Sequence, residues 1–250
     1  MAVVTLNRPA ARNALSMELK DALYRLVPVL DADPGTGCVL LSGSGGAFCS
    51  GGDTKVMAEG GKPPSMEDRQ RQLRWEHRLP RMLHELSKPV IAALPGAAAG
   101  AGFSLALACD LRIAGESAFL MTSFARLGLS GDYGGSWFLT QLVGTARARE
   151  LYFDPRRVTA AECERLGLVN RVVPDAELER ESFAWAARIA AGPPVAHRYM
   201  KRNLNRALSH DLATCLEFEA DRMVRGAMTD DYREAVAAFS NRRAPVFRGR

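Results

Sequence analysis

One uncharged, glycine-rich segment in the middle of the chain constrains the fold more than any other feature. Its first part, Val90–Leu94, is a short apolar run followed by Pro95-Gly96, which predicts a buried strand and a turn. Gly100-Ala101-Gly102 then precedes an apolar run that ends at Asp110. Glycines directly before a helix leave backbone N–H groups free to face a ligand, but the same glycines could serve only close packing. The many Gly, Ala and Pro residues argue against a membrane span, which normally consists of bulkier side chains.

The composition is typical of one globular domain, or of a domain with an appendage. The chain has 250 residues, of which 47% are hydrophobic and 24% charged, and a net charge of +5. The densest basic clusters, at residues 69–74 and 242–250, do not interleave charges with aromatic residues as a single-strand binder does, so we expect no nucleic-acid partner. The mild basic excess suits an anionic small ligand equally well.

The cysteines indicate a reducing environment. Their number is odd and none forms a CxxC pair: Cys38, Cys49, Cys109, Cys163 and Cys215. The first residues do not show a basic stretch followed by an apolar run, as a signal peptide does. We therefore expect a cytoplasmic protein without a membrane partner.

Strands alternate with helices until about residue 175, and the pattern is helical afterwards. This order predicts an α/β core with a helical appendage. Residues 58–70 are polar and rich in Gly and Pro, so we expect a mobile loop near the ligand. The strands are expected at residues 2–6, 38–41, 90–94, 111–114 and 168–173, and the helices at 19–30, 67–85, 103–109, 145–153, 160–166 and from 178 onward.

Several kinds of site are excluded by spacing. The chain has no G-x-G-x-x-G after a strand, no P-loop, no nucleophile elbow and no histidine pair at metal-ligand spacing, so we expect no metal. Two glycine-rich clusters remain, Ser50-Gly51-Gly52-Asp53, where Asp53 is a candidate helix N-cap, and Gly100-Ala101-Gly102. Two N–H donors directed at one oxygen form an oxyanion hole.

At this point several motifs, in order along nearly the whole chain, resemble the crotonase superfamily, which comprises the enoyl-CoA hydratases and isomerases. The motifs are Asn7-Arg8-Pro9, Asn13-Ala14-Leu15, Ala47–Asp53, Lys88–Ala93, Gly100-Ala101-Gly102, Cys109-Asp110, Gly134-Gly135-Ser136, Gly167-Leu168-Val169, Ala238-Phe239 and Pro245-Val246-Phe247. The resemblance implies an α/β fold built as a crotonase-like spiral of ββα units. It implies an acyl-CoA-binding core at residues 1–175 and a helical C-terminal trimerisation region at residues 176–250. The expected assembly is a homotrimer or a dimer of trimers.

The resemblance also implies the substrate and its contacts. The substrate is an acyl-CoA thioester, so coenzyme A is part of the substrate and no separate cofactor is expected. The backbone N–H groups of Gly52 and Ala101 would hold the thioester oxygen. Arg8, Lys55, Lys201 and Phe239 match positions that flank CoA, although Arg8 and Lys201 could equally be ordinary surface charges. The other expected substrate contacts are Ser50, Gly51, Asp53, Gly102, Ser104, Phe124, Tyr133, Gly134 and Trp137.

The catalytic acids favour isomerisation. The two glutamates of the family's hydratases are replaced by Ser104 and Phe124, which argues against ordinary hydration because neither side chain activates water. Asp132 matches the active-site Asp of isomerase-type members. One carboxylate suffices to move a proton between two carbons, and an apolar pocket from Phe103, Phe124, Tyr133 and Trp137 would raise its pKa.

Alternatives stay open at this point. Asp132 could attack covalently in a CoA-thioester hydrolase or dehalogenase, or it could simply cap the following helix. The chain could also be a hydratase-like lyase, or a non-catalytic acyl-CoA-binding protein. The aromatic residues suggest a roomy apolar pocket, but the sequence does not identify the acyl group.

Overall fold

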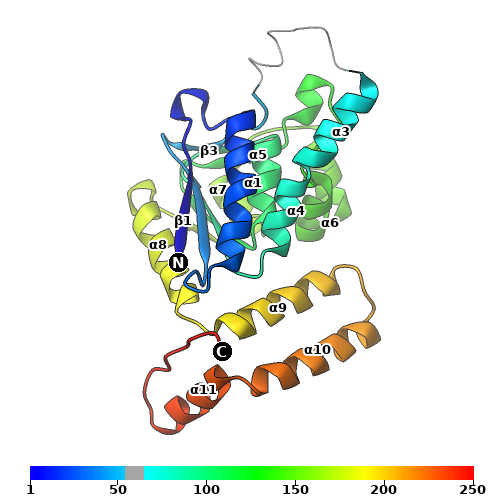
Figure 1. Ribbon diagram of the computed structural model, residues 1–250. Coiled ribbons are helices and arrows are strands. Elements are labelled where there is room, and N and C mark those ends of the chain that lie inside the picture. Colours follow the sequence, from blue (N-terminus) through cyan, green and yellow to red (C-terminus); the bar gives the residue numbers. More distant parts are fainter. Residues whose placement is uncertain (54–64) are drawn as a thin grey trace.

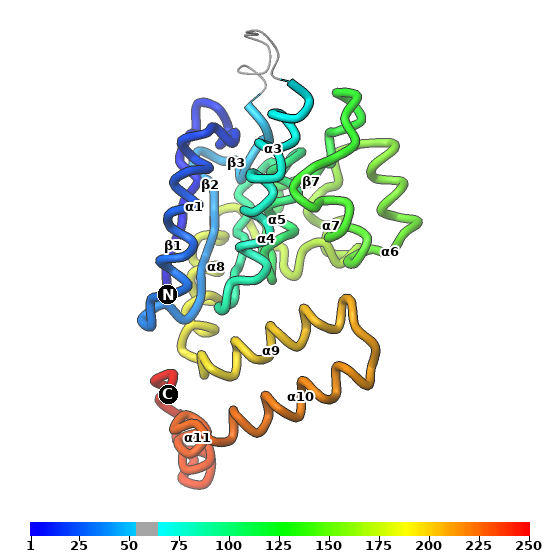
Figure 2. Tube along the Cα trace, turned by 45° about the vertical axis from the view of Figure 1, so that its right-hand side comes forward, coloured from blue at the N-terminus to red at the C-terminus, as the bar shows by residue number. Residues whose placement is uncertain are grey.

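The computed structural model describes residues 1–53 and 65–250 of the chain. Its core contains two β-sheets covered by helices, and three C-terminal helices form a layer that stands apart from this core (Figure 1). Figure 2 shows the same separation from a second direction, with the C-terminus beside the last helices. In the described part of the chain, no helix is both long enough and apolar enough to cross a membrane.

Three strand pairs follow one another along the chain, and the two members of each pair join different sheets. The pairs are β2 (Val39–Gly43) with β3 (Ala47–Cys49), β4 (Val90–Leu94) with β5 (Ala97–Ala99), and β6 (Leu111–Gly115) with β7 (Phe119–Met121). The first members lie in a parallel sheet with β1 (Ala2–Leu6) and β9 (Arg171–Val173), in the order β1-β2-β4-β6-β9. The second members lie in a smaller sheet with β8 (Val158–Thr159), in the order β3-β5-β7-β8. Helices follow each pair, so this part of the chain advances in ββα units.

The helices pack on these sheets and on one another. The core helices are α1 (Met17–Ala32), α3 (Met66–Glu76), α4 (Arg78–Glu85), α5 (Ala101–Ala108), α6 (Gly135–Phe153), α7 (Ala160–Arg165) and α8 (Leu178–Ala190). Short 3₁₀ turns are η1 (Pro9–Ala11), η2 (Phe124–Leu127) and η3 (Asp175–Glu177). All eight residues of α5 are buried, which explains why its sequence has neither charge nor a polar face.

The C-terminal layer consists of α9 (Pro194–Ala207), α10 (Leu212–Ala227) and α11 (Asp230–Ser240). Helix α8 is not part of it, because Leu178, Trp185 and Ala186 pack on the five-stranded sheet. A buried ion pair attaches α9 to the core: Lys201 Nζ lies 2.7 Å from Asp110 Oδ2 and also donates to the carbonyls of Leu83 and Lys88.

Most expected elements are confirmed, with instructive differences. The expected helix at 67–85 is interrupted at His77 because Pro80 has no N–H for the carbonyl of Glu76, which accepts a hydrogen bond from Tyr24 Oη instead. Residues 66–70, expected in a loop, begin α3, and the expected loop at 58–64 lies outside the described residues. Residues 168–170 do not belong to a strand, because Leu168 and Val169 donate to the carbonyl of Cys163 at the end of α7.

Candidate functional site

The two glycine-rich clusters meet because their strands are neighbours. β3 and β5 pair in parallel, so the loops that follow them start side by side. A side chain on Gly51 would lie 2.7 Å from the carbonyl oxygen of Ala99 and 3.2 Å from the nitrogen of Ala101. Gly51 also has a φ of +95°, so glycine is required there by conformation and by space.

The N–H groups of Gly52 and Ala101 are available to a ligand. In the described part of the chain, neither takes part in a backbone hydrogen bond with another loop or element. Ala101 is the first residue of α5, where an N–H has no partner within the helix and the helix dipole favours negative charge. These two donors can therefore stabilise a carbonyl oxygen on which negative charge develops.

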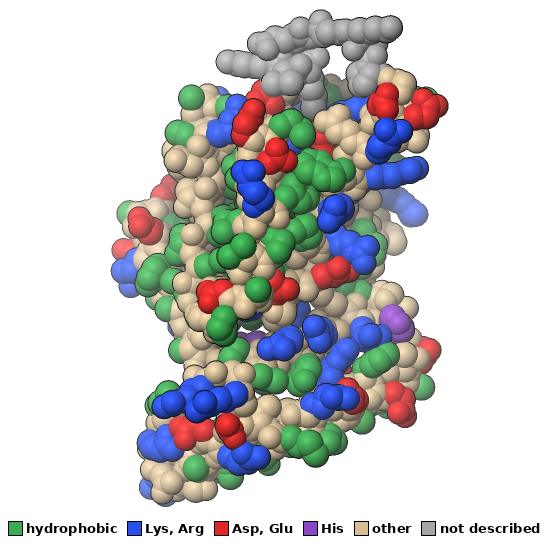
Figure 3. Space-filling view, viewed as in Figure 1, with side chains coloured by type: hydrophobic (Ala, Val, Ile, Leu, Met, Phe, Trp, Pro, Cys, Tyr) green, Lys and Arg blue, Asp and Glu red, His purple; other side chains and the backbone are tan. Residues whose placement is uncertain are grey.

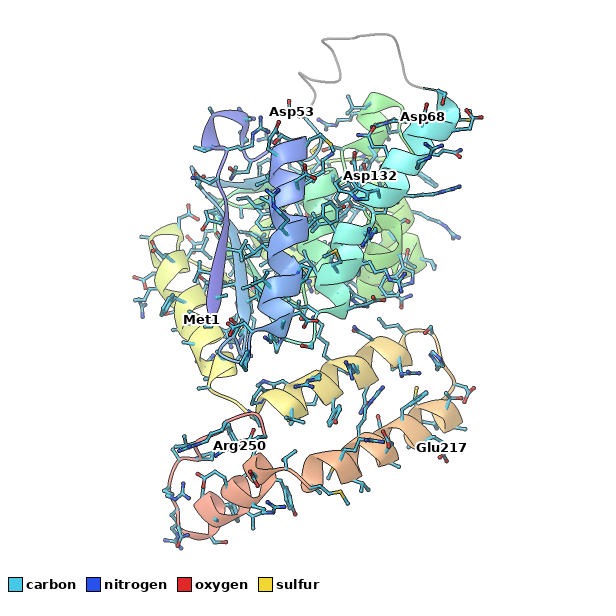
Figure 4. The ribbon with its side chains drawn as sticks, viewed as in Figure 1. Met1, Asp53, Asp68, Asp132, Glu217 and Arg250 are labelled. Carbon is cyan, nitrogen blue, oxygen red and sulfur yellow. The ribbon has the colours of Figure 1, made fainter. Side chains whose placement is uncertain are left out.

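Asp132 lies in the loop between η2 and α6, at the same end of the core as Asp53 (Figure 4). Its Oδ1 atom is buried and has no hydrogen-bond partner among the described residues. Burial, and to a smaller extent the charge of Glu76, raise the pKa of Asp132 to about 6, and the charges of Arg69 and Lys20 oppose the change. The alternative that Asp132 caps α6 is wrong, since Gly134 is the N-cap and no side chain bonds there.

A cavity of about 250 Å³ joins these groups. Gly52, Ala101 and Asp132 all line it, so the structure brings together the three residues that the sequence singles out for chemistry. The other described lining residues are Leu15, Ser16, Met17, Glu18, Lys20, Asp53, Arg69, Gln72, Leu73, Glu76 and Tyr133.

Two functional candidates in this cavity are not apparent from sequence patterns. Lys20 of α1 and Glu76 of α3 form an ion pair of 2.9 Å, with side chains 7% and 8% exposed. One signal could have pointed to Lys20, because it falls on the apolar stripe of its helix with Leu23 and Val27, all three buried. Glu76 gives no such signal, since it ends a helix rich in charged residues.

The structure describes most, but not all, of the residues expected to lie near the CoA phosphates or around the first glycine-rich cluster. Arg8 forms an ion pair with Asp53 at 3.0 Å and donates to the carbonyl of Ala14. Ser50 lies beside this loop and donates through Oγ to the carbonyl of Ala11. Lys55 lies outside the described residues, as does the helix that Asp53 was expected to cap.

Three other residues expected to contact substrate pack against other parts of the chain. A side chain on Gly102 would lie 2.2 Å from the carbonyl oxygen of Cys49, so this glycine permits α5 to pack on β3. Ser104 is fully buried and its Oγ lies 3.4 Å from the carbonyl oxygen of Gly100. Phe124 is buried and stacks on Tyr152, with ring centroids 5.9 Å apart. None of these three is among the described residues that line the cavity.

Trp137, Lys201 and Phe239 lie away from this cavity. Trp137 and Gly134 line a larger hollow of about 860 Å³, which Tyr133 shares with the smaller cavity. Figure 3 shows Lys and Arg side chains gathered where the core meets the C-terminal helices, and the hollow is lined by Arg81, Arg202, Arg206 and Arg222. Lys201 uses its ammonium within the chain, and Phe239 is 88% exposed on α11.

The aromatic residues expected around Asp132 are confirmed only in part. Of Phe103, Phe124, Tyr133 and Trp137, only Tyr133 is among the described lining residues, and the charged side chains of Lys20 and Glu76 also line the cavity. The pKa of Asp132 is raised as expected, with burial as the first cause and the Glu76 carboxylate as the second. In the described part of the chain, no group of His, Cys, Asp and Glu side chains is placed to hold a metal ion.

Comparisons with known proteins cover the whole chain. The family model described as enoyl-CoA hydratase/isomerase matches residues 1–250. The 1,2-epoxyphenylacetyl-CoA isomerase of Escherichia coli is 34% identical over 247 residues, covering 99% of this chain and 94% of that protein. The short-chain-enoyl-CoA hydratase of Clostridium acetobutylicum is 34% identical over 244 residues, covering 97% and 92%. The crystal structure of an enoyl-CoA hydratase from Bacillus anthracis matches with a TM-score of 0.94 at 34% identity, covering 99% of this chain and 95% of that one.

Proposed function

This chain belongs to the enoyl-CoA hydratase/isomerase family, and from that premise we propose that it is an acyl-CoA double-bond isomerase. Asp132 would take a proton from C2 of a 3-enoyl thioester. The resulting dienolate oxygen would accept hydrogen bonds from the N–H groups of Gly52 and Ala101. Protonated Asp132 would then deliver the proton to C4, which gives the 2-enoyl thioester and restores the carboxylate.

The observation that carries this proposal is the position of Asp132. Its carboxylate lines the same cavity as the two N–H donors, and in residues 1–53 and 65–250 its buried Oδ1 atom has no hydrogen-bond partner. A pKa of about 6 lets this group both accept and return a proton near neutral pH. One relative is named an isomerase, the 1,2-epoxyphenylacetyl-CoA isomerase of Escherichia coli.

Hydration of a 2-enoyl thioester is the second candidate, because one observation favours it. The cavity contains a second buried carboxylate, Glu76, and hydration uses two acid/base groups. Several relatives also carry the name enoyl-CoA hydratase. Glu76, however, comes from α3, whereas the positions of the hydratase glutamates hold Ser104 and Phe124.

Product analysis separates these candidates. The purified protein is incubated with a 3-enoyl-CoA and, separately, with a 2-enoyl-CoA, and the products are identified by mass and chromatography. Isomerisation gives the 2-enoyl ester at unchanged mass, whereas hydration adds the mass of one water molecule. Rapid water addition to the 2-enoyl ester without isomerisation of the 3-enoyl ester would overturn the leading proposal. Release of free CoA would indicate thioester hydrolysis by attack of Asp132.

We also propose that the C-terminal layer mediates assembly into a homotrimer or a dimer of trimers. Helices α9–α11 expose many large apolar side chains, more than the surface of a monomeric protein normally does. They are Met200, Leu204, Leu208, Leu212, Leu216, Met223, Val224, Met228, Tyr232, Val236 and Phe239. Light scattering after gel filtration measures the assembly mass, and a monomer at micromolar concentration would contradict the proposal.

A further inference from the structure

The wall of the cavity carries a buried ion pair that the proposed reaction does not use. Lys20 and Glu76 both line the cavity with Asp132, and their side chains are only 7% and 8% exposed. Glu76 Oε1 is fully engaged, since it accepts from Lys20 Nζ and from Gln72 Nε2, both at 2.9 Å.

The remaining atoms of the pair have spare hydrogen-bonding capacity. Among the residues that the structure describes, Glu76 Oε2 has only the hydroxyl of Tyr133 as a partner, at 3.4 Å, which is longer than an ordinary O–H···O hydrogen bond. Lys20 has three ammonium hydrogens, and in the described part of the chain its one ion-pair partner is Glu76. The pair can therefore still accept one strong hydrogen bond and donate another.

The ion pair disfavours a purely hydrocarbon acyl group next to it. A hydrocarbon chain would displace water from the ion pair and return no hydrogen bond, which is costly for charged groups. A hydroxyl group avoids this cost, because it can donate to Glu76 Oε2 and accept from Lys20 Nζ at once. The cavity volume of about 250 Å³ also suits a short acyl group better than a long one.

We propose that the acyl group of the substrate carries a hydroxyl at C4 or beyond, which Lys20 and Glu76 recognise together. The inference rests on the proposed function in one respect, namely that the acyl group of a CoA thioester enters this cavity. The pair is not needed merely to attach α1 to α3, because Tyr24 Oη already donates to the carbonyls of Trp75 and Glu76, each at 2.8 Å.

The test measures binding and so does not depend on turnover. Calorimetry compares saturated acyl-CoA esters of four to six carbons with their 4-, 5- and 6-hydroxy counterparts. We expect at least one hydroxyacyl ester to bind about tenfold more tightly than its parent, which is the usual effect of a charge-assisted hydrogen bond. If the wild-type protein binds every parent ester at least as tightly as its hydroxy counterpart, the inference is wrong.

A double variant assigns the preference to this pair. Lys20→Met together with Glu76→Leu replaces both charges, a change that buried pairs often tolerate, and should abolish or reverse the preference. The matched control removes an exposed ion pair at the start of α8, outside the described lining of the cavity, with Arg180→Met and Glu177→Leu, and should keep the preference. A preference that survives the loss of Lys20 and Glu76 would overturn the assignment. A hydroxyacyl preference without isomerisation of any 3-enoyl ester would instead contradict the proposed function and leave this inference standing.

Discussion

Gly102 offers a sharp perturbation of the proposed oxyanion hole, because it is not among the described residues that line the cavity and yet its contact with Cys49 determines where α5 begins. A side chain there would lie 2.2 Å from the carbonyl oxygen of Cys49, whereas ordinary contacts begin near 3.4 Å. In Gly102→Ala, the start of α5 must therefore move away from β3 by about 1 Å. The helix cannot absorb this elsewhere, since all eight of its residues are buried.

This displacement moves the N–H of Ala101 relative to that of Gly52. Loss of one oxyanion-hole donor lowers kcat by about 10²- to 10³-fold, or about 2.7–4 kcal/mol. We expect Gly102→Ala to reduce kcat for isomerisation of a 3-enoyl-CoA by about 10²-fold with a smaller effect on KM. Overpacking should also lower the free energy of unfolding by about 1–3 kcal/mol, measured by urea denaturation.

Gly226→Ala is the matched control, because Gly226 also lies within a helix and a side chain there would meet no atom within 4 Å. It should keep wild-type kcat and stability, or gain slightly in helix stability. If Gly102→Ala keeps wild-type kcat and stability as well, the close approach of α5 to β3 does not position the site.

Three further predictions concern the charged groups. Since the pKa of Asp132 is about 6, kcat/KM should fall about tenfold per pH unit below that value. Glu76→Gln should move the inflection of this pH profile to lower pH, because the charge of Glu76 raises the pKa of Asp132. An inflection that stays in place in the variant would contradict this effect of Glu76. Asp132→Asn should raise the free energy of unfolding by up to about 3 kcal/mol at pH 7 and leave it unchanged at pH 3. The reason is that a carboxylate with a raised pKa destabilises the folded state, and this destabilisation develops as the pH rises from about 4 to 6. Urea denaturation at both pH values tests this. Lys201→Met should lower the free energy of unfolding by about 3–5 kcal/mol by leaving Asp110 buried without its cation, and KM for the thioester should not change; a raised KM at unchanged stability would instead support the expected phosphate contact.

The larger elements could be predicted because their sequences show regularly spaced apolar residues or end at Pro and Gly residues. Val90–Leu94 is an apolar run closed by Pro95, and it forms β4 at the centre of the sheet. The family resemblance and the α/β crotonase-like fold are confirmed by the family match and by solved structures. The sequence does not predict the strands of the smaller sheet, since a segment such as Ala97–Ala99 is too short to show a period and is defined only by its neighbours.

The candidate site likewise has one part that the sequence predicts and one part that it does not. The two glycine clusters and the lone acid in an apolar loop are visible in single stretches of sequence, and the family resemblance implies Gly52, Ala101 and Asp132 as the residues that act. The pairing of Lys20 with Glu76 was not predictable, because it depends on how α3 packs against α1, and a charge on either helix normally faces solvent. The surroundings of Trp137 also depend on how the helices pack, and this residue lines the hollow at the C-terminal helices instead of the cavity around Asp132.

The central claim is that Asp132 transfers the proton, and one comparison tests it most directly. Wild-type protein and Asp132→Asn are assayed with a saturating 3-enoyl-CoA, and binding of the saturated acyl-CoA is measured for both by calorimetry. We expect the variant to lose about 10²- to 10⁴-fold in kcat while it binds the saturated ester as tightly as the wild type. An Asn variant that isomerises the 3-enoyl ester at the wild-type rate would contradict the account.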